Sequence, residues 1–154
     1  MKIFISYSTA QDQIIALRLQ TLAAVYGVTV YVPPATTRQG WTGVLVPEVQ
    51  NHLSQSDVVL AVVTQNPTQG AVNEMNTALQ LGKLLIPIVT QSVPREYYAS
   101  FPAYFVVDPV NPWQTEQAIV QFLKDRQQSD AIKAGLLALA TVAVGLLLFG
   151  SESD

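Results

Sequence analysis

Cysteine is absent from this chain of 154 residues, and histidine occurs once. Without cysteine the chain has no disulfide framework, no thiolate nucleophile and no zinc–cysteine site, while its redox compartment stays open. The single histidine, His52, lies in a segment with the pattern of an amphipathic helix and has no evident partner groups, so we interpret it as a helix-surface residue. We therefore expect no Ser-His-Asp site, no metal site and no bound cofactor.

Charge is also scarce, because only 12% of the residues are charged and the net charge is −3. The eight lysines and arginines are scattered along the sequence and form no basic stripe, which argues against nucleic acid as a partner. Apolar residues make up 49% of the chain, enough for the core of one domain with a tail. The first seven residues lack the pattern of a signal peptide, so we expect the N-terminal domain to stay in the cytosol.

Short runs of β-branched and aromatic residues alternate with helical patterns along the chain. The expected strands are residues 3–7, 28–32, 57–64, 84–90 and 104–107, and helical patterns separate them and cover 112–127. This alternation predicts an α/β fold with right-handed crossovers. With five strands we expect a flavodoxin-like parallel sheet, order 2-1-3-4-5, flanked by helices.

Helix boundaries are predicted from local signals. Ser8 and Gln11 form a possible capping box at the start of the first helix, and Gly27 follows its end. Asn66 resembles an N-cap, with Pro67 at the first helical position of the third helix.

Ligands of such sheets bind at the carboxyl ends of the strands that flank the point where the strand order reverses. Here these are the first and third strands. The predicted crevice is lined by residues 7–9, by the loop 33–43, by Gln65 and Asn66, and by the helix that follows them.

The C-terminal part of the chain contains sixteen residues without a charge, 134–149, of which only Thr141 is polar. A membrane-spanning helix needs about 17–25 residues. Extending the run to 131–150 gives twenty residues interrupted only by Lys133, whose long side chain can reach the membrane interface. We therefore predict a C-terminal hydrophobic helix that spans a membrane; the alternative is a buried C-terminal helix.

Charges on either side of this run predict its orientation. Lys124, Arg126 and Lys133 precede it, and two acidic residues follow it. The positive-inside rule then places the domain in the cytoplasm and the short acidic end outside. We predict a folded domain over 1–127, and a single-pass anchor with an acidic tail over 128–154.

Four segments together resemble the TIR (Toll/interleukin-1 receptor) domain family over roughly residues 1–126. They are FISYS (Phe4–Ser8), the loop after the second strand with RQGW (Arg38–Trp41), the strand DVVLAVVT (57–64) and NEMNTALQLGKLLIPIV (Asn73–Val89). The last contains the pattern E-x-x-x-A-L-x-x-G-K-x-x-I-P-I, the most specific of the four.

The resemblance implies one of two functions, an enzyme or a signalling scaffold. Some TIR domains cleave the nicotinamide–ribose bond of NAD, and others only self-associate as signalling scaffolds. In the enzymatic members a helix glutamate engages the ribose, and Glu74 falls on that position. A carboxylate beside the ribose can stabilise the positive charge that develops there.

The position of Glu74 on its helix leaves two interpretations open. The apolar stripe consists of Ala71, Val72, Met75, Ala78 and Leu79. At about 100° per residue, Glu74 lies roughly 90–100° from the centre of this stripe, at its margin. A margin position is compatible with a crevice and equally with a solvated flank of the helix.

Other site residues also follow from the resemblance. Tyr7 and Ser8 would line the nucleotide site, together with Arg38, Gly40 and Trp41 from the covering loop. Asn66 is added to this set as a residue of the crevice predicted from the sheet topology. Trp41 could stack on a base or form an interface, and Arg38 could meet a phosphate or remain solvated.

Two departures from the family pattern weaken the match to its efficient NAD-cleaving members. Gly70 stands where enzymatic members often carry an aromatic residue, and Ser8 and Thr9 replace basic residues found in some members.

The sequence therefore leaves several functions open. The first is a membrane-tethered NAD glycohydrolase or ADP-ribose cyclase that is activated by self-assembly, in prokaryotic immune defence. The second is a membrane-anchored scaffold without activity. The third is an enzyme similar to nucleoside deoxyribosyltransferases, which share the sheet and a helix glutamate, although the FISYS opening argues against it. In the fourth, the tail itself disrupts a membrane when the domain oligomerises.

Overall fold

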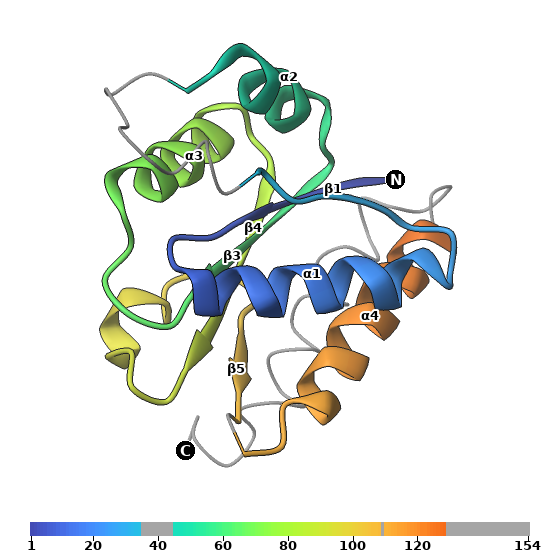
Figure 1. Cartoon of the computed structure of the whole chain (residues 1–154), viewed down its shortest axis with the longest axis vertical. Coiled ribbons are helices and arrows are strands. Elements are labelled where there is room, and N and C mark those ends of the chain that lie inside the picture. The colour runs from blue at the N-terminus through green and yellow to red at the C-terminus, as the bar shows by residue number, and fades with distance from the viewer. Residues whose placement is uncertain (35–44, 109, 129–154) are drawn as a thin grey trace.

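A computed structural model describes residues 1–34, 45–108 and 110–128 (Figure 1). The described elements are β1 (Lys2–Ser6), α1 (Ala10–Ala24), β2 (Thr29–Tyr31), α2 (Pro47–Gln55), β3 (Val58–Val63), α3 (Gln69–Gln80), β4 (Leu84–Thr90), the 3-10 helix η2 (Arg95–Tyr97), β5 (Phe105–Val107) and α4 (Trp113–Gln128). The predicted run 134–149 and the loop residues Arg38, Gly40 and Trp41 lie outside these ranges. Within them, no helix is long and apolar enough to cross a membrane.

The five strands form one parallel sheet with the order β2-β1-β3-β4-β5, which confirms the predicted flavodoxin-like topology. In register, Ile3 of β1 pairs with Val30 of β2 and with Val58 of β3. The strand order reverses between β1 and β3, so these two strands flank the expected crevice.

Helices cover both faces of the sheet (Figure 1). On the face covered by α1 and α4, a large apolar cluster includes Ile5, Leu60 and Ile119. On the face covered by α2 and α3, a smaller cluster includes Phe4 and Leu53. Successive strand side chains point to opposite faces, so the polar residues that follow β1 are also distributed between the two faces.

The connections at the amino ends of β2 and β4 share one geometry. Gly27 and Gly82 have φ values of +73° and +71°, a conformation that favours glycine. After α1, the Val28 amide donates to the Ala23 carbonyl at 3.1 Å, and after α3 the Lys83 amide donates to the Ala78 carbonyl at 3.0 Å. These are Schellman-type helix ends, which confirms Gly27 as the signal that ends the first helix.

Two predicted helix starts are wrong by one or two residues. The capping box of α1 is formed by Thr9 and Asp12, with the Asp12 amide donating to Thr9 Oγ1 at 3.1 Å. The predicted box at Ser8 fails because the Ser8 hydroxyl accepts a hydrogen bond from the Thr68 amide at 2.9 Å. The N-cap of α3 is Thr68 rather than Asn66, because the Thr68 hydroxyl accepts from the Ala71 amide at 3.3 Å.

Candidate functional site

Glu74 lies inside the molecule, with none of its surface exposed. Helix α3 directs Gly70, Ala71, Glu74 and Ala78 inward, so the carboxylate occupies the centre of the buried face. Leu79, assigned to the apolar stripe, is instead 51% exposed. The solvated-flank interpretation of Glu74 is therefore wrong, because the buried face is built from small residues one turn apart rather than from the larger apolar ones.

The side chain of Glu74 reaches the carboxyl end of β1. Ser6 is the last residue of that strand, and its Oγ donates a hydrogen bond of 2.7 Å to Glu74 Oε1. Both side chains are buried, and a hydrogen bond to a carboxylate in such surroundings is stronger than one between neutral groups. This contact fixes the carboxylate beside the point where the strand order reverses.

A second hydrogen bond joins the carboxyl end of β1 to α3. Ser8 follows β1, and its hydroxyl accepts a hydrogen bond from the amide of Thr68, the N-cap of α3. Ser6 and Ser8 lie two residues apart in extended chain and both contact the α3 region. The carboxyl end of β1 is thus fastened to α3 at both its first turn and its middle.

Tyr7, between these serines, points to the opposite face of the sheet. Its ring is buried in the cluster with α1 and α4. Its hydroxyl donates to the Pro33 carbonyl and accepts from Gln13 Nε2 at 3.2 Å. The structure therefore does not bring Tyr7 together with Glu74, and Tyr7 instead ties β1 to the chain that leaves β2.

Asp12 is a buried carboxylate that the sequence analysis missed. It has no exposed surface, its carboxylate accepts from the Thr9 amide in the α1 capping box, and it accepts a hydrogen bond from the Thr64 hydroxyl at the end of β3. The sequence signal that could have revealed it is the Thr9-x-x-Asp12 spacing, a capping box in which the acid replaces the usual Glu or Gln. Two buried carboxylates, Asp12 and Glu74, thus flank the carboxyl ends of β1 and β3.

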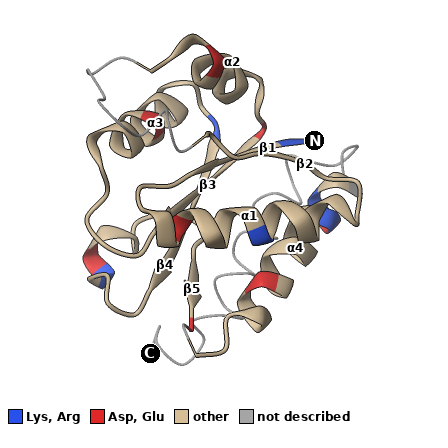
Figure 2. Cartoon of the chain, in the orientation of Figure 1, with Lys and Arg blue, Asp and Glu red and all other residues tan. Residues whose placement is uncertain are grey.

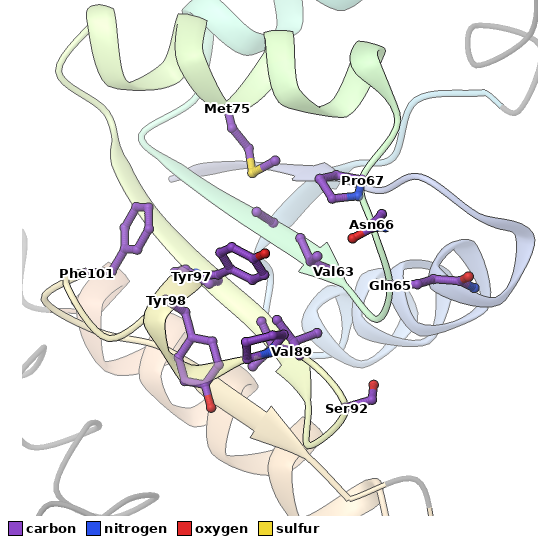
Figure 3. A pocket seen from close by; sticks show the side chains of 14 residues that line it. Val63, Gln65, Asn66, Pro67, Met75, Val89, Ser92, Tyr97, Tyr98 and Phe101 are labelled. Carbon is purple, nitrogen blue, oxygen red and sulfur yellow. The ribbon is translucent and has the colours of Figure 1, made fainter.

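A cavity of about 350 Å³ lies beneath α3, over β3 and β4 (Figure 3). Its lining residues are mostly apolar or aromatic: Ala61, Val63, Gln65, Asn66, Pro67, Met75, Pro87, Val89, Ser92, Val93, Pro94, Tyr97, Tyr98 and Phe101. Figure 3 shows Met75 reaching from α3 toward Tyr97, with Asn66 and Gln65 on the side opposite Phe101. The predicted site residue Asn66 therefore lines a pocket, while the aromatic wall from 97–101 was not foreseen.

Among the described residues, no charged side chain lines this cavity. Its size and apolar walls, with a few amide and hydroxyl groups, are typical of small-molecule sites. Glu74 is not among the lining residues, although its neighbour Met75 is, so the carboxylate does not open onto the cavity.

His52 takes no part in this arrangement. Its ring is half-buried on α2 and stacks on Tyr31, with ring centroids 3.7 Å apart. The described residues include no group of three or more metal-ligating side chains placed to hold an ion.

Two solved structures resemble this chain at low identity. A 2-deoxyribosyltransferase from the psychrotolerant bacterium Bacillus psychrosaccharolyticus has a TM-score of 0.51 and 17% identity, over 68% of this chain and 85% of that one. The TIR domains of the activated Roq1 resistosome have a TM-score of 0.47 and 14% identity, over 94% and 82%. No family model and no curated protein matches the sequence. The likeness to the 2-deoxyribosyltransferase shows the fold alone and leaves the activity to be argued from the site.

Proposed function

We propose that this chain is a TIR-type enzyme that cleaves the nicotinamide–ribose bond of NAD, with Glu74 as its catalytic carboxylate. The observation that carries the proposal is the buried Glu74, held by Ser6 at the carboxyl end of β1, where the strand order reverses. The sequence resemblance to TIR domains puts the catalytic glutamate of that family at the same position. Ligands of doubly wound sheets bind at this edge.

Cleavage of the nicotinamide–ribose bond requires mainly a negative charge that is held close to the ribose. When the bond between C1′ and the nicotinamide nitrogen breaks, its electron pair leaves with nicotinamide and positive charge develops on the ribose. A carboxylate fixed beside the ribose stabilises that charge, and water then adds at C1′ with loss of a proton. The uncharged, aromatic-lined cavity beside the β3–α3 connection would suit a heterocyclic base of the substrate.

The burial of Glu74 adds a condition to this proposal. Because the carboxylate has no exposed surface, a substrate can touch it only after the groups that cover it move. Activation by self-assembly, proposed for this chain, would supply such a rearrangement. Specific activity should then rise with protein concentration, and activity strictly proportional to concentration would argue against this part of the proposal.

The decisive experiment compares wild type with Glu74→Gln in the full chain reconstituted into vesicles, following nicotinamide release from NAD. Glutamine keeps the volume of the side chain and an oxygen that accepts from Ser6, so the fold should survive while the charge is lost. We expect a loss of activity of about 100-fold or more.

A matched control is Glu48→Gln, which removes an exposed carboxylate on the first turn of α2 and should leave the activity unchanged. Wild type that releases no nicotinamide when assembled, or Glu74→Gln that retains full activity, would refute the proposal. Adding a 2-deoxynucleoside and a second free base tests sugar transfer, which the enzyme named in the structural comparison suggests.

The second candidate function is a scaffold without activity, and one observation favours it. Helix α1 exposes Ile14 and Leu17, which line a hollow of about 410 Å³ together with Arg18, Thr21 and Leu22. An apolar outer face of this kind is suited to packing against another copy. Leu17→Glu should then abolish assembly, whereas Glu74→Gln should leave every function of a scaffold intact.

A further inference from the structure

The charges of the described residues are unevenly divided between the two edges of the sheet. All strands of a parallel sheet begin at one edge, here called the amino edge, where the preceding helices end. Lys2 begins β1, Lys83 precedes β4, and Lys124 and Arg126 lie at the end of α4. Two carboxylates share this edge, Asp57 and Asp125.

The opposite, carboxyl edge is acidic. Six carboxylates lie there or on the helix turns that start from it: Asp12, Glu48, Glu74, Glu96, Asp108 and Glu116. Among the described residues, the cations on that side are Arg95 and, further along α1, Arg18, which forms an ion pair of 2.8 Å with Glu116. Figure 2 shows blue at the marked N-terminus and near the end of α1, with some red beside each, and red at the start of α1, on α2 and on α4.

Among the described residues, the two carboxylates of the amino edge offset only part of the positive charge carried by its four cations. Asp57 Oδ2 accepts from the Lys2 backbone amide at 2.9 Å, and Asp125 Oδ1 accepts from Gln121 Nε2 at 2.8 Å. The Lys83 ammonium donates to the Ser54 carbonyl at 2.8 Å, and that of Lys124 lies 4.9 Å from the centre of the Tyr26 ring. The partner group is therefore a backbone carbonyl for Lys83 and an aromatic ring for Lys124, and in neither contact is it a carboxylate.

Large apolar side chains are exposed among these cations. Val25 and Tyr26 follow α1 and are 76% and 42% exposed, and Leu79 and Leu81 at the end of α3 are 51% and 48% exposed. Cations interspersed with exposed aliphatic and tyrosine side chains are the composition of surfaces that rest on acidic lipid headgroups.

The path of the chain points to the same edge. Helix α4 ends at Gln128, one turn after Lys124 has reached the end of α1. The uncharged run 134–149, predicted from sequence to enter a bilayer, begins six residues later. A linker of this length keeps the amino edge close to the point where the chain would enter the membrane.

We propose that the amino edge of the sheet is a docking surface for an anionic lipid bilayer. Lys2, Lys83, Lys124 and Arg126 meet the acidic headgroups, and Val25, Tyr26, Leu79 and Leu81 enter the interface. The carboxyl edge, with Glu74 and the cavity, then faces the aqueous phase. Since β4 spans seven residues, this edge stands about 20 Å above the bilayer surface. The proposal that the amino edge docks on a bilayer does not depend on whether the chain cleaves NAD.

The absence of cysteine permits a direct test with single cysteines carrying an environment-sensitive fluorophore. The labels are placed at Val25→Cys and Leu81→Cys on the amino edge and at Trp113→Cys on the carboxyl edge, where Trp113 is 56% exposed. The full chain is reconstituted into vesicles of phosphatidylcholine with about one third phosphatidylserine. We expect blue-shifted emission and quenching by lipid-borne quenchers at positions 25 and 81, and neither at 113.

Charge reversal provides the matched comparison. Lys83→Glu or Lys124→Glu should lower the bilayer-bound population of the label at Val25→Cys about fivefold for each lysine, and high salt should do the same. Arg95→Glu, on the carboxyl edge, should have no effect. Equal responses at 25, 81 and 113, no response at any of them, a response that persists in vesicles of phosphatidylcholine alone, or no association with vesicles would each overturn the proposal.

Discussion

The two edges of one sheet differ in this protein in how their polar groups are used. At the carboxyl edge, the contacts Ser6–Glu74 and Thr64–Asp12 join polar side chains that turn inward and connect one element to another. At the amino edge, the ammonium groups of Lys2 and Lys83 contact a glutamine side chain and a backbone carbonyl. Buried polar contacts fix a geometry, whereas exposed ones leave charge available to a partner.

The largest difference in stability should appear between two aspartates. Asp12→Ala removes the acid of the α1 capping box and leaves the Thr64 hydroxyl without its carboxylate, so we expect a loss of about 2–4 kcal/mol. Asp57→Ala removes an exposed carboxylate on the amino edge and should cost less than about 1 kcal/mol. Thermal unfolding of the full chain in mild detergent measures both. Equal losses would show that the polar contacts of the carboxyl edge contribute no more to stability than those of the amino edge.

A smaller difference in stability is expected between alanine variants of Ser6 and Ser54. Ser6→Ala removes the donor to Glu74, and we expect a loss of about 1–2 kcal/mol, because a buried carboxylate then lacks one of its hydrogen bonds. If Glu74 is catalytic, NAD cleavage should fall as well.

The control is Ser54→Ala near the amino edge, where the exposed hydroxyl donates to the Asn51 carbonyl at 2.9 Å. It should change the unfolding temperature hardly at all, with activity unaltered. A Ser6→Ala variant as stable and as active as wild type would argue that the contact does not position Glu74.

The smallest loss of stability is expected for substitutions at the two glycines of the amino edge, Gly27 and Gly82. Gly27 and Gly82 both have positive φ, and a methyl group at either position would contact no atom within 4 Å. Alanine should therefore cost only the backbone strain, about 1 kcal/mol at each position, and asparagine should cost less. The same unfolding experiment measures the series; a loss much greater than this would show that backbone strain is not the main cost of these substitutions.

Local patterns were sufficient to predict the strands. The β-branched run at 57–64 predicted β3 because a strand buried on both faces of a parallel sheet must be apolar throughout. Gly27 predicted a helix end because few other residues adopt its backbone conformation. Boundaries were less accurate where two residues close together in the sequence both have side chains that can cap a helix. Ser8 and Asn66 had suitable residue types, yet Thr9 and Thr68 cap the helices.

The alternation of strands and helices in the sequence by itself determined the fold, the order of the strands and the edge where a site should lie, because connection rules leave few alternatives. Only the tertiary structure decided that Glu74 is buried against Ser6, that Tyr7 points to the opposite face, and that residues 97–101 wall a cavity. It also gathered cations that are scattered in the sequence onto one edge. Each of these depends on which residues far apart along the chain become neighbours, and periodicity within one segment carries no such information.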